Sequence, residues 1–145
     1  SSNYVILQEY VEGAENGDVR IIMLNGEPVG AVRRRPAEKD HRSNLSAGGT
    51  YEKHSLTRQE KLICKRIGPK LVKDGLYFVG IDVIGGKLIE VNVMSPGGVV
   101  PVNKMNKTKI QKLVVDFIED KVNEMVYKID RRSRLRNQVQ QSSDR

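Results

Sequence analysis

Two strongly apolar segments, residues 76–84 and 88–94, flank residues 85–87 (Gly-Gly-Lys) and predict a β-hairpin. A three-residue loop over 85–87 places Asp82 directly opposite Glu90, whereas a two-residue turn places the two carboxylates on different faces. A one-residue slip exchanges the faces of a strand, so the two-residue turn would mix carboxylates with the core on both sides. That mixing costs on the order of several kcal/mol. The apolar pattern therefore predicts the three-residue loop, provided that neither strand contains a bulge.

The three-residue loop sorts the hairpin into an apolar face and a polar face. It pairs Ile84 with Leu88, and it places Gly80 and Asn92 beside the two carboxylates on the polar face. Opposed carboxylates repel each other, so a positive group is expected between them. Mg²⁺ is one candidate because it prefers hard oxygen ligands, and a lysine or arginine side chain is the other. The spacing alone leaves both open. The apolar face holds Val79, Ile81, Val83, Ile89, Val91 and Val93.

The first third of the chain predicts three further strands. Residues 4–11 are rich in β-branched and aromatic side chains, which favour a strand. Residues 18–24 and 28–34 predict a hairpin around Asn25-Gly26, a strong turn dipeptide. Residues 36–51 have no periodicity and predict a long loop, a kind of segment that often carries function.

Two helices are predicted in the rest of the chain. Thr57 and Glu60 form a capping-box pattern that begins the first helix. Gly68-Pro69 predicts a kink in this helix, and Gly75 predicts its end. A second helix over about 106–129 carries an apolar stripe; its heptad-like spacing leaves a coiled coil open, but packing on a sheet is the simpler expectation. The order of elements predicts an α+β fold, with a largely antiparallel sheet packed with two main helices.

Composition narrows the classes of protein to consider. The chain has 145 residues, enough for one compact domain, and a net charge of +7. Residues 130–145 are basic with almost no apolar content and predict a disordered tail, which leaves 4–129 as the folded domain. The chain has no Trp and only two Phe and five Tyr. The basic residues near 33–42 therefore favour a loop that binds phosphate or carboxylate over a nucleic-acid surface.

Two features of the sequence bear on the cellular location that we expect: the lack of a long apolar run and the presence of a single cysteine. No apolar run approaches the roughly 20 residues of a membrane-spanning helix, so no membrane partner is expected. The single cysteine, Cys64, cannot form an internal disulfide; we expect it to be a packing residue in a cytoplasmic protein. The chain does not begin with Met, which is typical of a segment of a longer protein.

Several motifs, in order, resemble the C-terminal part of the ATP-grasp domain of bacterial-type glutathione synthetases, a family of the ATP-grasp superfamily. The resemblance covers most of residues 8 to about 126 and implies the fold of the C-terminal ATP-grasp subdomain. Its strongest part is the hairpin sequence FVGIDVIG followed by LIEVNVMSP, residues 78–85 and 88–96. The supporting motifs are QEYV at 8–11, GDVR at 17–20, GEPV at 26–29, RSNLSAGG at 42–49 and IGP at 67–69.

The resemblance implies a role for each matching residue. Asp82, Glu90 and Asn92 would hold Mg²⁺ (or Mn²⁺) that bridges the phosphates of ATP, the co-substrate, while phosphate passes to a substrate carboxylate. The implied catalytic residues are Arg20, Arg42 and Asn44. The implied ATP contacts are Gln8, Glu9, Tyr10, Val11, Asp18 and Arg42. The implied substrate contacts are Arg20, Arg34, Gly48, Gly49 and Ser95, because guanidinium groups suit anions and glycine permits close backbone approach.

The sequence also departs from the family pattern. The family usually has Thr before the Ser-Pro pair, whereas this chain has Met94, followed by a different loop over 96–100. That loop borders the substrate region, so the acceptor amine is left open. Nothing before Gln8 supplies the family's two ATP-contacting lysines or its glycine-rich lid. We therefore expect this chain alone to be catalytically incomplete.

Three functional hypotheses result. The first is the C-terminal part of a ligase that joins γ-glutamylcysteine to glycine with ATP, through an acyl phosphate. The second is another ATP-grasp ligase with a different acid and amine. The third is a non-catalytic binding module, against which the complete set Arg42, Asp82, Glu90 and Asn92 argues. The expected partners are ATP and small acidic peptide and amine substrates, with no nucleic acid; a homo-oligomer of the full-length protein is left open.

Overall fold

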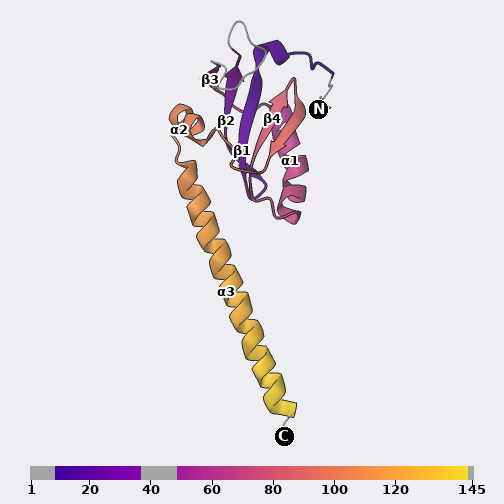
Figure 1. The fold of residues 1–145 in the computed structure, drawn as a ribbon, viewed down its shortest axis with the longest axis vertical. Helices are drawn as coiled ribbons and strands as arrows, with labels where there is room; N and C mark the ends of the chain where they lie inside the picture. Colours follow the sequence, from indigo (N-terminus) through magenta and orange to yellow (C-terminus); the bar gives the residue numbers. More distant parts are fainter. Residues whose placement is uncertain (1–8, 37–48, 144–145) are drawn as a thin grey trace, which may run out of the picture. The chain divides into compact units, whose positions relative to one another are not determined.

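The computed structural model describes residues 9–36 and 49–143. The chain divides into two compact units, residues 1–110 and residues 111–145. The first unit is built on a five-stranded antiparallel sheet with the strand order β3-β2-β1-β4-β5, which confirms the predicted α+β class (Figure 1). Its strands are β1 (Asp18–Leu24), β2 (Glu27–Arg35), β3 (Thr50–Lys53), β4 (Phe78–Ile84) and β5 (Lys87–Asn92). Its helices are η1 (Ala14–Asn16), α1 (Arg58–Lys73) and α2 (Val99–Asn106).

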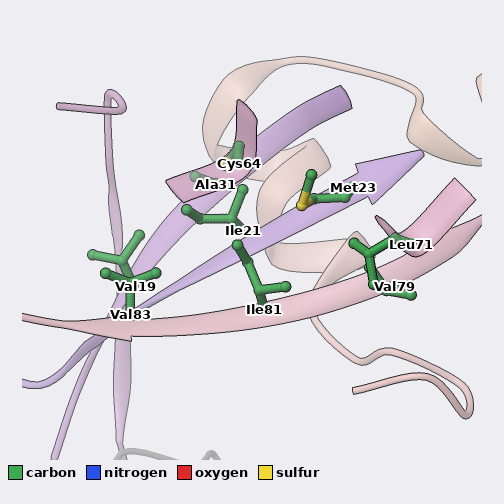
Figure 2. Packing of buried hydrophobic residues seen from close by; sticks show 9 residues of the cluster. All are labelled: Val19, Ile21, Met23, Ala31, Cys64, Leu71, Val79, Ile81 and Val83. Atoms are coloured by element: carbon green, nitrogen blue, oxygen red, sulfur yellow. The ribbon is translucent and has the colours of Figure 1, made fainter. Parts of the chain in front are cut away.

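One face of the sheet packs against α1 and forms the main core (Figure 2). Alternate residues of the neighbouring strands β1 and β4 lie side by side on this face as cross-strand pairs, and α1 contributes Cys64 and Leu71. Cys64 is 1% exposed, which agrees with its predicted packing role, and burial raises the pKa of its thiol to about 11. Each large apolar side chain buried here stabilises the fold by about 1.5–3 kcal/mol. The strand residues of the core are Val19, Ile21, Met23, Ala31, Val79, Ile81 and Val83.

The predicted hairpin between β1 and β2 is confirmed, and its turn is also a packing surface. Asn25 and Gly26 both have positive φ, as a two-residue hairpin turn requires. The backbone of Gly26 lies against Gly68 of α1, so a Cβ at Gly68 would collide with the Gly26 carbonyl oxygen. Glycine at these two positions is what allows the helix to approach the turn.

The ends of α1 confirm the predicted signals. The Thr57 hydroxyl accepts from the Glu60 amide at 3.2 Å, and the Glu60 carboxylate accepts from the Thr57 amide at 2.7 Å, so the capping box is complete. At the other end Gly75 has φ 76° and its amide donates to the Val72 carbonyl. The amide of Leu76 donates to the carbonyl of Leu71, which completes a Schellman motif. Pro69 lies inside this helix, which remains one element over residues 58–73.

The second face of the sheet packs against α2, a helix that the sequence interpretation misses. Val102 and Ile110 are fully buried, and both crowd Gly30 of β2, where a Cβ would collide with Val102. The predicted single helix from about 106 is therefore wrong at its start. Lys107 has a left-handed φ of 54° that ends α2, and the Asn103 side chain accepts from the amide of Ile110, where α3 begins.

The last helix, α3 (Ile110–Ser143), begins at the last residue of the first unit and contains all the described residues of the second unit. The predicted disordered tail over 130–145 is wrong for residues 130–143, which continue this helix. The segment contains neither Gly nor Pro, and its Arg, Leu and Gln residues have high helix propensity, so nothing local ends the helix at residue 129. The division of the chain into a domain over 4–129 and a tail stays a prediction. Within the part of the chain that the structure describes, no helix is long and apolar enough to cross a membrane.

The N-terminal segment and the long loop also differ from expectation. Residues 9–11 of the predicted strand over 4–11 have no regular structure, and the rest of that strand lies outside the described residues. Val11 and Glu12 pass beside the β4–β5 turn, where a Cβ at Gly85 would lie 2.7 Å from the carbonyl oxygen of Glu12 and 3.8 Å from Val11 Cγ1. The predicted loop over 36–51 extends too far, because Thr50 begins β3, which pairs with β2 at the edge of the sheet.

Candidate functional site

The β4–β5 hairpin places Asp82 opposite Glu90, as predicted, but by a different route. The turn has two residues, Gly85 and Gly86, so Ile84 pairs with Lys87 and the predicted three-residue loop is wrong. A bulge at residue 89 restores the register, because β5 contributes one extra residue between the pairs Val83–Leu88 and Asp82–Glu90. The turn is short because both glycines adopt positive φ, and the bulge keeps the carboxylates on one face.

Asp82 is buried and is surrounded by hydrogen-bond donors. Arg20, its direct partner across β1 and β4, donates from Nε to Oδ1 at 2.5 Å and from Nη2 to Oδ2 at 2.9 Å. Arg34 Nη2 lies 3.0 Å from the same Oδ2. Of the two candidates for the positive group beside the carboxylates, arginine side chains therefore take this place at Asp82. The side chains of Asp82 and Arg20 are 7% and 8% exposed, so this ion pair lies out of bulk water.

A second acid, Asp18, holds Arg34. The two residues are paired across β1 and β2, and Arg34 Nε donates to Asp18 Oδ2 at 2.9 Å and Oδ1 at 3.1 Å. Arg34 Nη2 also donates to Asp18 Oδ2. Burial alone would lower the pKa of Arg34, but the hydrogen bond to Asp18 and the charge of Asp82 outweigh it and raise that pKa. The Arg34 guanidinium therefore stays charged.

The loop between β5 and α2 closes over the site. Arg20 Nη1 donates to the carbonyl oxygen of Gly97 at 2.8 Å. Gly80 lies beneath this loop, because a Cβ there would meet Pro96 at 3.1 Å and Arg20 at 3.2 Å. Ser95 has a left-handed φ of 46° at the start of the loop. The backbone of residues 95–97 is expected at the substrate from the family resemblance, but the contact of the Gly97 carbonyl with Arg20 is not predicted. The signal for this contact is Gly80 on the polar face of β4, because glycine in a strand marks close backbone approach.

Asn92 adds a third oxygen ligand beside the carboxylates of Asp82 and Glu90. Its amide hydrogen bonds are satisfied better with O and N exchanged, since Nδ2 then donates to Glu90 Oε1 at 3.1 Å and Oδ1 accepts from Arg20 Nη2 at 3.3 Å. In this orientation the Asn92 side-chain oxygen lies 3.3 Å from Asp82 Oδ2. Two carboxylates and one amide oxygen so close together fit a hard divalent cation. Within the described ranges, no three His, Cys, Asp or Glu side chains could hold a metal ion, so a site here requires the amide.

The structure brings six of the predicted site residues together: Asp18, Arg20, Arg34, Asp82, Glu90 and Asn92. It does not join the predicted ATP contacts at 9–11 to this cluster by any hydrogen bond or ion pair between described residues, and Tyr10 is 64% exposed. Gly49 directly precedes β3. Gln8, Arg42, Asn44 and Gly48, which were predicted to contact ATP, the phosphoryl group or the substrate, lie outside the described residues.

Comparison with known protein families assigns most of the chain to one family. A family model described as prokaryotic glutathione synthetase, ATP-grasp domain, matches residues 1–107. The antiparallel sheet with its face of arginines, carboxylates and an asparagine is thus part of an ATP-grasp domain. Within that class, the chain belongs to the prokaryotic glutathione synthetase family.

Curated relatives give the same assignment over most of the chain. It is 50% identical over 116 residues to a glutathione synthetase of Agrobacterium fabrum, which is 80% of this chain and 36% of the relative. It is 48% identical over 114 residues to that of Thermosynechococcus vestitus, covering 79% of this chain and 36% of the relative. The chain therefore spans about 36% of the length of these relatives.

Proposed function

We propose that this chain is the part of an ATP-dependent carboxylate–amine ligase that handles the divalent cation and the phosphates. The observation that supports this role is the single polar face on which Asp82, Glu90 and Asn92 lie beside Arg20 and Arg34. A ligase that activates a carboxylate as an acyl phosphate must manage the negative charge of ATP, of the phosphoryl group in transfer and of the acid. A face with oxygen ligands and guanidinium donors within a few ångströms suits all three.

The chain's own residues would divide this work. Asp82, Glu90 and Asn92 would bind Mg²⁺ or Mn²⁺, which supplies electrostatic screening of the phosphates when bound. Arg20 and Arg34 would orient anionic groups through their planar forks, with Arg20 fixed by the Gly97 carbonyl and Arg34 by Asp18. From the family resemblance we assign the phosphoryl group to Arg42 and Asn44, the adenine side of ATP to residues 8–11, and the substrate to Gly48, Gly49 and Ser95.

The proposed reaction joins γ-glutamylcysteine to glycine and converts ATP to ADP and phosphate. The relatives named glutathione synthetase support this choice of substrates. The proposed setting is a reducing cytoplasm, supported by the single, buried Cys64 thiol. Because the chain spans about 36% of these relatives, the reaction is proposed for the complete polypeptide that contains it.

A chimera tests the proposal directly. Residues 1–107 of this chain would replace the matching segment of the Thermosynechococcus vestitus glutathione synthetase. We expect the chimera to release phosphate from ATP only when γ-glutamylcysteine and glycine are both present. Asp82→Asn in the chimera should lower the rate by about 100-fold or more, because it removes an anionic ligand of the cation. Glu52→Gln, which alters an exposed pair with Arg35, is the matched control and should leave the rate unchanged. A chimera whose rate survives Asp82→Asn would refute the role of this face.

A second candidate, a ligase with a different acceptor amine, is favoured by one observation. The loop that carries the Gly97 carbonyl begins with Met94-Ser95, where the family usually has Thr before the Ser-Pro pair, and Met94 is 88% exposed. A panel of amino acids in place of glycine distinguishes the two candidates. Faster turnover of the chimera with another amine than with glycine would select the second, provided that the loop over 94–100 comes from this chain.

A further inference from the structure

Two different arginines share the Oδ2 oxygen of Asp82. It accepts from Arg20 Nη2 at 2.9 Å and lies 3.0 Å from Arg34 Nη2, whereas among the residues that the structure describes Oδ1 accepts from Arg20 Nε alone. In the exchanged orientation described above, the Asn92 side-chain oxygen also lies 3.3 Å from this Oδ2, but it donates no hydrogen bond to it. A carboxylate oxygen has about two lone pairs, so the two arginine donors already use the bonding capacity of Oδ2. A cation that binds Asp82 through Oδ2, the oxygen that faces the Asn92 side chain, therefore has to displace one of these two donors.

Both arginines have a second anchor that does not involve Asp82. Arg34 is held by Asp18 through Nε as well as Nη2, and Arg20 is held through Nη1 by the Gly97 carbonyl. An arginine that loses its contact with Asp82 would therefore stay on this face, and the N–H group that had contacted Asp82 could bind another acceptor. Of the two, Arg20 binds Asp82 in the bidentate manner and Arg34 through one nitrogen only, so Arg34 is the donor that yields more readily.

The charges of the face make this exchange favourable for a second ligand. Asp18, Asp82 and Glu90 carry three negative charges, and Arg20 and Arg34 carry two positive ones. One divalent cation changes the sum from −1 to +1, which attracts an anion to the released guanidinium. Asp82 and Arg20 are buried, so their charges are only weakly screened, whereas Glu90 is exposed.

We propose that a divalent cation and an anionic group bind this face cooperatively, because the cation takes Asp82 Oδ2 from Arg34 and the released Arg34 donor receives the anion. Asp18 is the positioning residue that keeps Arg34 in reach after the exchange. This inference rests on the proposed function, since it assigns the cation to Asp82. It adds that Asp82 binds Arg34 when no cation is present and binds the cation when it is. Each ligand must then increase the affinity of the other by the same factor.

The experiment titrates the 145-residue chain with Mn²⁺ by calorimetry, with and without sulfate as the anion probe. We expect sulfate to tighten Mn²⁺ binding by about 5-fold or more, and Mn²⁺ to tighten sulfate binding equally. Arg34→Met should reduce this coupling to less than about 2-fold while Mn²⁺ alone binds at least as tightly as to the wild type, because the competitor at Oδ2 is gone. Arg35→Met, which removes the neighbouring arginine that pairs with Glu52, is the matched control and should keep the wild-type coupling.

Asp18→Asn provides a second variant in case Arg34→Met does not fold, which circular dichroism checks. This variant removes the negative charge that competes with Asp82 for Arg34, so Arg34 should bind Asp82 more strongly. Mn²⁺ alone should therefore bind more weakly than to the wild type. Unchanged coupling in Arg34→Met, or unchanged Mn²⁺ affinity in Asp18→Asn, would overturn the exchange. A wild type that binds Mn²⁺ without any coupling to sulfate would overturn the exchange alone, whereas a wild type that binds no Mn²⁺ would count against the proposed cation site as well.

Discussion

Asp82 is a structural residue as well as a proposed ligand, because two arginines depend on it for their charge balance. Arg20 and Asp82 are buried, and Arg34 is largely buried beside them. A buried pair of this kind contributes little net stability when it is complete, but removal of one partner leaves an uncompensated charge. The same side chains therefore serve both the proposed ligand binding and the stability of the fold.

Asp82→Asn should consequently destabilise the chain even without ligands. We expect the free energy of unfolding to fall by about 3 kcal/mol, because Arg20 loses its buried counter-charge. Urea unfolding followed by circular dichroism measures this change. Glu52→Gln breaks the Arg35–Glu52 pair, whose side chains are nearly half exposed, and should cost less than about 1 kcal/mol. Equal costs for the two variants would contradict a buried, mutually dependent network.

At the scale of single elements, the start of α1 has a defined dependence on acid. Burial alone would raise the pKa of Glu60, but hydrogen bonds from His54 and from the Thr57 backbone lower it below its usual value of about 4.5. A depressed pKa in the folded state adds stability above the unfolded-state pKa, and this stability is lost as the pH falls through the folded-state pKa. Glu60→Gln should therefore lose less stability than the wild type between pH 7 and pH 3. Urea midpoints at the two pH values test this, and exposed Glu27→Gln should behave like the wild type.

The contact between α1 and the β1–β2 turn gives a second prediction at this scale. Gly68→Ala gains about 1 kcal/mol of helix propensity, yet its Cβ would collide with the Gly26 carbonyl oxygen. The neighbour is backbone and cannot rotate away, so we expect a net destabilisation of about 1–3 kcal/mol. Gly75→Asn is the matched control, because nothing lies within 4 Å of its Cβ and Asn tolerates the left-handed φ. A stabilised Gly68→Ala variant would show that helix and turn are not in contact.

How far sequence reasoning reaches depends on whether a feature is local. The capping box, the Gly75 end of α1 and the Asn25-Gly26 turn are set by residues a few positions apart, and all three are confirmed. The opposition of Asp82 and Glu90 is also confirmed, although the predicted loop length is wrong, because the apolar pattern fixes faces and cannot reveal a bulge. The pairing of Arg20 and Arg34 with the carboxylates depends on the order of strands in the sheet, which local patterns do not contain.

At the scale of the whole molecule, helix content reports whether residues 130–143 continue α3. Within the described residues, the three α-helices contain 16, 8 and 34 residues, about two fifths of the chain. Leu135→Pro should end the last helix early and remove the helical signal of roughly ten residues, because proline lacks the amide hydrogen and collides with the preceding turn. Far-UV circular dichroism measures this loss, and Leu135→Ala should preserve the spectrum. An unchanged spectrum of the proline variant would mean that this segment is not helical in solution.

The bulge in β5 also bears on how this hairpin can change during evolution. Ile89 is the extra residue, and its neighbours Leu88 and Glu90 already pair with Val83 and Asp82. A chain that lost the codon for Ile89 would therefore keep Asp82 opposite Glu90 and would have a regular ladder in place of the bulge. Loss of a codon at the turn or between Asp82 and Ile84 has no such compensation. A one-codon gap at position 89 is thus the length change that family members can carry without disturbing the pair of acids.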